Sequence, residues 1–205
     1  MSEVKKIFTE IYEKNLWTSQ ESNSGAGSEL KNTEVIRQEI PEVIKKFGIK
    51  SILDIPCGDF NWMKSVDLSE VSYMGADIVE SLVEINKKKF DGVNFQVLDI
   101  IQDELPKVDL IFARDILGHL TYENINKSIA NIRNSGSKYL LTTSFTKWHY
   151  NSDIKDGDWR PINLMIPPFN MKPIYLINEN CVEGGTDYND KCLLLFDIEK
   201  IFCGM

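Results

Sequence analysis

The sequence predicts an α/β protein with a doubly wound, mostly parallel sheet of seven strands. Between residues 50 and 144, short apolar runs alternate with segments in which apolar residues recur at helical spacing. That alternation is typical of a parallel sheet covered by helices on both faces. Two later apolar runs, 173–183 and 191–198, flank a turn rich in Gly and Asp, which predicts a C-terminal antiparallel hairpin at the sheet edge.

Two helices are expected before the sheet. Apolar residues at helical spacing predict the first at residues 3–14, and a loop rich in Ser, Gly and Asn follows it. The second is expected to begin at Asn32, a suitable N-cap, and to stop at Gly48. Pro41 lies inside this helix, at a position where it could kink.

The elements of the sheet follow from residue 50. They are expected in the order strand 50–55, a short helix near 60–65, strand 72–77, helix 79–90, strand 94–98, strand 108–113, helix 122–133 and strand 138–144. The next segment contains two tryptophans and two adjacent prolines and has little periodicity. Long irregular segments inside a compact domain are usually functional or disordered, and the aromatic content of this one favours function.

Composition and charge exclude several classes of protein. The sequence has 23 Lys and Arg against 31 Asp and Glu, a formal net charge of −8, which argues against a nucleic-acid partner. No apolar run is long enough to span a membrane and the N-terminus lacks the apolar core of a signal peptide, so we expect a soluble, cytoplasmic protein. Its four cysteines have no CxxC spacing, which indicates free thiols.

The Pro-Cys-Gly-Asp turn after strand 50–55 indicates a ligand site. A strand that leads into a glycine turn and a helix is the usual architecture for a nucleotide-like ligand. A dinucleotide needs a G-x-G-x-x-G set, whereas this turn has only Gly58, and Asp54 and Asp59 would repel a pyrophosphate. The same carboxylates suit the sulfonium and ammonium groups of S-adenosylmethionine.

The next two strands also end in acidic residues. Asp77 ends the second strand, where its two oxygens could bind both ribose hydroxyls of an adenosyl ligand. Asp99 and Ile100 follow the third, where the carboxylate could accept from an adenine amine while Ile100 covers the ring. Each acid alone could be a solvated strand end or a helix cap, but three at consecutive strand ends favour a site.

Four stretches of the sequence carry a family resemblance. SILDIPCGDF, YMGADIVESL, FQVLDI and VDLIFARDILGHL resemble, in order and spacing, the motifs of class I S-adenosylmethionine-dependent methyltransferases. The resemblance covers residues 35–144 and implies a Rossmann-like fold with S-adenosylmethionine as cofactor. The chain departs from the usual glycine-rich first motif at Pro56, and by placing Asp59 and Phe60 after Gly58.

One domain, 1–205, is expected. It divides into an N-terminal helix and cofactor-covering loop (1–34), a cofactor-binding core (35–144), a substrate loop (145–172) and a C-terminal hairpin (173–205).

A narrower resemblance points to the acceptor. NLWTSQESNSGAGSELKNTEVIR and GDWRPINL are similar to a bacterial group of methyltransferases associated with capsule and surface-polysaccharide sugars. This implies methyl transfer to a sugar hydroxyl, of a nucleotide-activated sugar or a surface glycan precursor, and a small-molecule sugar or sugar nucleotide as partner. A methyltransferase of a non-sugar metabolite and a catalytically silent nucleotide-binding scaffold remain alternatives, and a homodimer remains open.

The fourth strand delivers Arg114, Asp115 and His119 to the edge of the sheet where such reactions occur. Methyl transfer to a hydroxyl requires removal of its proton, for which a histidine with an ordinary pKa of about 6.5 is suited. We expect His119 to be the general base and Asp115 to orient it or the sugar hydroxyl, with His149 as a second candidate base. The alternative for His119 is a helix-flanking residue packed over the sheet.

The loop before the second predicted helix completes the cofactor site. Gly25 and Ser28 of the GAGSE stretch, with Trp17 and Arg37, could close over the methionine end of the cofactor, unless the loop is a flexible linker. The candidate cofactor-binding residues are therefore Trp17, Gly25, Ser28, Arg37, Asp54, Pro56, Gly58, Asp59, Asp77, Ile78, Asp99, Ile100 and Arg114.

The irregular segment supplies candidate substrate residues. Trp148 and Trp159 offer flat apolar faces to sugar rings, and His149 lies beside the first. Arg160 could meet the phosphates of a sugar nucleotide, with ordinary loop packing as the alternative. The aspartates of SDIKDGDW lack the spacing of an EF-hand, so this stretch is expected to be a turn and no metal ligand is assigned, with metal dependence left open.

Overall fold

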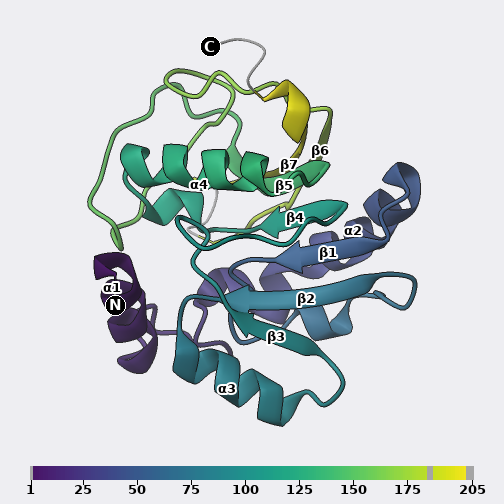
Figure 1. Cartoon of the computed structure of the whole chain (residues 1–205). Helices are drawn as coiled ribbons and strands as arrows, with labels where there is room; N and C mark the ends of the chain where they lie inside the picture. The colour runs from purple at the N-terminus through teal and green to yellow at the C-terminus, as the bar shows by residue number, and fades with distance from the viewer. Residues whose placement is uncertain (1, 184–186, 202–205) are drawn as a thin grey trace.

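A computed structural model describes residues 2–183 and 187–201. Its seven strands form one sheet in the order β3-β2-β1-β4-β5-β7-β6 (Figure 1). The pairings from β3 to β5 are parallel, and β7 runs antiparallel between β5 and β6. The strands are β1 Ser51–Asp54, β2 Ser72–Asp77, β3 Asn94–Val97, β4 Leu110–Ala113, β5 Tyr139–Phe145, β6 Tyr175–Asn178 and β7 Lys191–Asp197.

The predicted sheet and its C-terminal hairpin are confirmed. The center of the predicted hairpin turn, 184–186, lies outside the described residues, as does Cys203. The other three cysteines are free and buried. No helix within the described ranges is long and apolar enough to cross a membrane.

Helices cover both faces of the sheet, because neighbouring strand residues point to opposite sides. Leu53 and Ile111 belong to one core, shared with α1 and α4, while Ile52 and Leu110 belong to a second core, shared with α2. Figure 1 shows α4 in front of the sheet and α2 behind it. The helices are α1 Glu3–Glu13, α2 Glu34–Phe47, α3 Glu80–Lys89 and α4 Tyr122–Asn134.

Local chemistry sets the helix ends. The side chains of Ser2 and Thr121 cap α1 and α4, and α2 ends at Gly48, whose φ of 65° is left-handed. The expected N-cap of α2 was wrong. Thr33 occupies that position, because the Asn32 side-chain amide donates to the Ala26 carbonyl at 2.7 Å instead.

The short helix expected near 60–65 is reduced to one 3₁₀ turn, Met63–Ser65. Phe60 has a φ of 58°, so the chain cannot continue a right-handed helix through that residue. No α-helix therefore begins at the turn after β1, and an extended loop leads from this turn to β2. This differs from the strand, turn and helix unit that the sequence predicted.

The topology gathers several polar residues at one edge. Asp54 and Asp77 end parallel strands, and Arg114 directly follows another. Because β7 is antiparallel, its first residue, Lys191, lies opposite Phe145 at the same edge where the parallel strands end. Figure 1 shows α1 beyond these strand ends.

Candidate functional site

The carboxyl ends of the strands border a cavity of about 550 Å³. Its opposite wall comes from α1 and from residues 17–28, which we call the strap. Most of the predicted site residues line it: Trp17, Gly25, Ser28, Asp54, Pro56, Gly58, Asp77, Ile78, Arg114, Asp115, His119 and Trp159. The volume is within the range of about 300–1,000 Å³ typical of small-molecule sites.

Asp54 brings a buried carboxyl group to the cavity. The hydroxyl of Tyr73 donates to its Oδ2 at 2.6 Å. Burial raises the pKa of Asp54 to about 8, and the Tyr73 hydrogen bond only partly opposes this. The group is therefore poised to ionise when a positive charge approaches it.

Asp77 presents a second buried carboxylate at the end of β2. It accepts from the backbone N–H groups of Gly58 at 3.2 Å and Val79 at 3.0 Å. Burial raises the pKa of Asp77 to about 6, while these backbone donors favour the charged form. Asp77 is thus mostly ionised at neutral pH, and it also fixes Gly58 in the turn after β1.

His119 has a defined protonation pattern. Its Nδ1 lies 2.9 Å from the carbonyl oxygen of Asp158. Because a carbonyl oxygen only accepts, Nδ1 carries the proton and Nε2 keeps its lone pair in the neutral ring. Burial lowers the pKa of His119, opposed in part by the Asp158 carbonyl. The ring packs on Trp17 of the strap, with centroids 5.4 Å apart.

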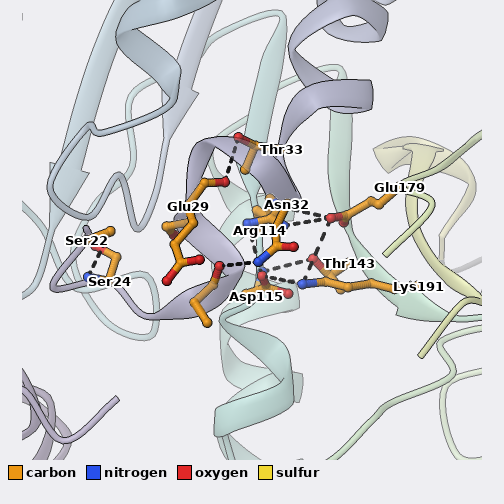
Figure 2. Close-up of polar contacts among 12 residues, drawn as sticks. Ser22, Ser24, Glu29, Asn32, Thr33, Arg114, Asp115, Thr143, Glu179 and Lys191 are labelled. Atoms are coloured by element: carbon orange, nitrogen blue, oxygen red, sulfur yellow. Dashed lines mark hydrogen bonds and ion pairs between the residues drawn. The ribbon is translucent and has the colours of Figure 1, made fainter. Parts of the chain in front are cut away.

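Four charged residues form what we call the charge cluster: Arg114, Asp115, Glu179 and Lys191 (Figure 2). Arg114 donates to Glu179 at 2.6 Å and lies 3.1 Å from Asp115. Lys191 donates to Asp115 at 2.7 Å. All but Asp115 are nine-tenths buried or more, so their mutual pairing is what allows these charges inside the protein.

Asp115 occupies a strained position in this cluster. Its φ is 60°, an uncommon value for a residue with a side chain, and its N–H donates to Thr143 Oγ1 at 2.9 Å. Burial alone would raise the pKa of Asp115, but the charges of Arg114 and Lys191 lower it well below its usual value. Asp115 is therefore ionised throughout the physiological pH range.

The strap is held mainly by side chains of the loop after β1. The Asp59 carboxylate accepts from the hydroxyl of Ser22 at 3.0 Å and from the N–H of Asn23 at 3.1 Å. The N–H of Asp59 donates to Ser24 Oγ at 3.0 Å. A Cβ on Gly58, whose φ is 54°, would collide with that same Ser24 hydroxyl, so the turn and the strap pack directly against each other.

Asp59 and Arg37 do not line the cavity, which corrects their predicted roles. The Asp59 carboxylate is used by strap residues, as described above. The Arg37 guanidinium donates to the carbonyl of Leu30 at 3.1 Å, so it serves the segment before α2. Neither side chain lines the cavity in this structure.

Asp99 and Ile100 line a separate apolar crevice of about 20 Å³ under α1. Phe8, Pro56 and Ile78 border both this crevice and the main cavity, so the two spaces are neighbours. The N–H of Ile101 donates to the Asp99 carboxylate at 2.9 Å. The predicted adenine contacts thus lie beside the cavity instead of in its wall.

Arg160, Trp148 and His149 also lie outside the cavity wall, which corrects the predicted substrate set. The Arg160 guanidinium is 6% exposed and donates to backbone carbonyls of residues 117, 118, 120 and 152. It is committed to fixing the turn that carries His119, so it is not available to a phosphate. Trp148 packs on the exposed Tyr150, and His149 is exposed.

The aspartates of SDIKDGDW form a turn, as predicted. Asp156 accepts from the N–H of Thr121 at 2.8 Å, and Asp153 accepts from the N–H of Tyr122 at 2.8 Å. These bonds tie the turn to the start of α4. Across the described ranges, no group of three or more His, Cys, Asp and Glu side chains could hold a metal ion.

The sequence reasoning missed Lys191, Glu179 and Gly27. Lys191 and Gly27 line the cavity. Glu179 does not line it, but it pairs with Arg114 in the charge cluster. Lys191 and Glu179 are charged residues within the two apolar runs of the predicted hairpin. A charged residue in such a run could have indicated a functional role. Gly27 lies within the GAGSE stretch, beside the two residues of it that were selected.

Comparison with known proteins supports the fold. No family model and no curated protein sequence matches the chain. A solved S-adenosylmethionine-dependent methyltransferase from Clostridium acetobutylicum ATCC 824 is 13% identical, with a TM-score of 0.60 over 94% of this chain and 98% of that one. Magnesium protoporphyrin IX methyltransferase from Synechocystis PCC 6803 is 16% identical, with a TM-score of 0.50 over 75% and 81%.

A solved protein of echinomycin biosynthesis and an amino pentose methyltransferase from Micromonospora echinaspora also match, but the match covers only 50% and 58% of those two chains. At these levels of identity the likeness concerns the arrangement of the backbone. The chain has the α/β fold of class I methyltransferases, as the sequence motifs predicted.

Proposed function

We propose that this protein is an S-adenosylmethionine-dependent O-methyltransferase that acts on a sugar hydroxyl. The observation that carries the proposal is a single cavity that combines buried carboxylates at the strand ends with a histidine whose Nε2 is free to accept a proton. The fold, shared with solved methyltransferases of 13% and 16% identity, supports the same assignment.

The charges of the cavity fit this cofactor. Asp54 and Asp77 are buried carboxyl groups with raised pKa values, and a cationic ligand beside them would favour their ionised forms. A pyrophosphate would meet the same groups with repulsion, and the turn offers it no start of an α-helix.

His119 is proposed as the general base. When bound, the cofactor supplies an electrophilic methyl group. Nε2 of His119 would take the hydroxyl proton as the acceptor oxygen bonds to the methyl carbon, which would leave the cofactor's sulfur. The carbonyl of Asp158 holds the ring in the required tautomer, and the negative charge of Asp115 favours the imidazolium that results.

A sugar acceptor is supported by the mouth of the cavity. Trp159 lines it and is 43% exposed, so an indole surface is available to a sugar ring. Tyr188 packs perpendicular to this indole, with centroids 5.1 Å apart, and steadies it. A nucleotide-activated sugar or a glycan precursor remains the proposed source of the hydroxyl, with phosphate recognition by Arg160 removed from the proposal.

Calorimetric titration with S-adenosylmethionine, S-adenosylhomocysteine and NAD tests the cofactor. We expect the first two to bind and NAD not to bind. Transfer of a radiolabelled methyl group to a panel of hexoses, nucleotide sugars and non-sugar alcohols then tests the acceptor. Binding of the cofactor without transfer to any of them would favour a silent scaffold, and transfer only to non-sugar alcohols would favour the other alternative.

The variant His119→Asn tests the base. We expect it to lower kcat by about 100-fold or more while cofactor affinity stays close to the wild-type value. The matched control is His149→Asn, since His149 is exposed and lies outside the cavity. Full activity in His119→Asn would assign proton removal to another group.

A further inference from the structure

Resting on the proposed methyl transfer, we infer that Asp115 and Lys191 bind the hydroxyl next to the one that is methylated, and that the acceptor is an uncharged vicinal diol. Both residues line the cavity, on the side of the sheet edge formed by β4 and β7. Asp115 and Lys191 have hydrogen-bonding groups without a partner among the described residues, and open space lies beside them.

Lys191 has donors to spare. Its side chain is 5% exposed, and its one hydrogen bond among the described residues is to Asp115 Oδ2. The nearest oxygen of Glu179 is 3.9 Å away, which is an ion pair and too long for a hydrogen bond. A lysine ammonium carries three N–H groups, so two remain available in a buried side chain that faces the cavity.

Asp115 supplies the complementary acceptor. Its contacts to Arg114 and Lys191 both involve Oδ2, and no described residue donates to Oδ1. A sugar hydroxyl both donates and accepts, so it can give its proton to Oδ1 and accept from Lys191. Because two carboxylates and two cations make up the cluster, a neutral acceptor fits here better than an anionic one, which would find no unpaired positive charge.

Gly27 keeps this pair accessible. A Cβ at residue 27 would lie 3.2 Å from Asp115 Oδ2 and 3.5 Å from Lys191 Nζ. The backbone of Gly27 lies outside the left-handed region, so the need for glycine here comes from the space beside the pair. Hydroxyl binding at this pair would hold one oxygen of a diol while its neighbour meets His119, whose titration both Asp115 and Lys191 influence.

The test uses the full chain loaded with S-adenosylhomocysteine or S-adenosylmethionine. Probes are the methyl glycosides of glucose, galactose and mannose, their monodeoxy analogues, and the corresponding 6-phosphates. Binding is measured by saturation-transfer NMR and methyl transfer by radiolabel. We expect binding and transfer with at least one neutral hexoside, and loss of both when the hydroxyl adjacent to the methylated one is absent.

Variants separate recognition from stability. We expect Lys191→Met and Gly27→Ala each to raise the acceptor KM at least 10-fold without changing cofactor affinity, and Lys191→Arg to restore part of it. Lys138→Met, at an exposed lysine at the other end of the sheet, is the matched control. A lower Tm with an unchanged KM in Lys191→Met would overturn the inference, because a purely structural lysine predicts that result.

Other results are equally decisive. Cofactor binding with no neutral hexoside bound or methylated overturns the diol assignment, as does preference for a 6-phosphate. Failure to bind S-adenosylmethionine at all would instead contradict the proposed function. The two failures are therefore distinguishable in the same set of measurements.

Discussion

The two walls of the cavity are built differently. On the sheet side, Asp77 and Arg114 are buried at strand ends, where the backbone ladder and paired charges fix them. On the other side, the strap crosses the cavity without a strand or an α-helix, and side chains such as Asp59 and Asn61 hold it in place. Both walls face one space, but they depend on different interactions.

Because of this difference, we expect the sheet side to determine the affinity for the cofactor and the strap to determine how the cofactor enters and leaves the cavity. Groups fixed by the sheet cannot move without disturbing the core, so they provide the stable part of a binding site. The strap is held mainly by side-chain hydrogen bonds and not by a backbone ladder, so we expect it to open more readily than the sheet. We therefore expect substitutions of Asp54 and Asp77 to change the equilibrium affinity for the cofactor, and the loss of Asp59, which holds the strap, to change the rate at which the cofactor dissociates.

The largest expected effect is on the sheet side. We expect Asp77→Asn to weaken S-adenosylmethionine binding by at least about 100-fold, because the two proposed hydrogen bonds from ribose hydroxyls to a buried charge would be worth about 1.5–3 kcal/mol each. Calorimetry measures the affinity, and circular dichroism checks that the fold is retained. Unchanged affinity in a folded variant would remove Asp77 from the site.

A smaller effect is expected on the strap. Asp59→Ala removes the acceptor for Ser22 and Asn23, and we expect the cofactor to dissociate about 10-fold faster, because water replaces part of these two hydrogen bonds, which are worth about 1.5–3 kcal/mol each to a charged group. Hydrogen exchange should show faster exchange of amides 22–28, with sheet amides unchanged. The control is Asp67→Ala, an exposed aspartate whose hydrogen bonds among the described residues are both to Ser69.

The outcome of that experiment can contradict the comparison. Equal exchange across the strap in Asp59→Ala and in the wild type would mean that other contacts hold the strap. Faster exchange throughout the sheet would mean that the two walls are one cooperative unit.

The smallest effect concerns Asp54 and pH. Burial raises the pKa of Asp54 to about 8, and an unfolded aspartate titrates near 4. Between these values the folded chain binds a proton that the unfolded chain releases, so this group stabilises the fold less as pH rises from about 4 to 8. We expect Asp54→Asn to gain stability relative to the wild type by about 1 kcal/mol or more between pH 5 and pH 8.

Thermal unfolding at several pH values measures this difference. Tyr73 can donate to an asparagine carbonyl as it does to the carboxyl group, so the hydrogen bond is kept. Parallel Tm curves for the two proteins from pH 5 to pH 8 would show that Asp54 titrates normally. Because a cation favours the ionised carboxyl groups, S-adenosylmethionine affinity should also rise with pH in the wild type. Asp54→Asn should lose the part of this rise near pH 8 and keep the part that Asp77 contributes near pH 6.

The sequence could predict the sheet-side wall because the order and direction of the strands determine which residues lie there. Once 51–54 and 72–77 are assigned as neighbouring parallel strands, Asp54 and Asp77 must lie at one edge. His119 could be placed near that edge by the same reasoning. Lys191 could not, because its position requires knowing that β7 inserts antiparallel between β5 and β6.

The errors fall on residues whose partners are distant in sequence. Arg160 looked available to a ligand, but the turn at 117–120 leaves carbonyl groups without helical partners, and the guanidinium satisfies them. Asp59 looked like a ligand contact, but its partners in the strap lie 35 residues or more earlier in the chain. No local pattern in the sequence reveals such pairings.

The contact between Gly58 and Ser24 has a consequence for sequence variation. A side chain at residue 58 would occupy the volume of the Ser24 hydroxyl, so the glycine of the first motif is required by the strap as well as by its own φ. Substitutions at the two positions should therefore be coupled during evolution. Related chains that replace this glycine are expected to carry a smaller residue at 24 or a different strap. Sequence changes at these two positions would therefore identify chains that close the cavity in another way.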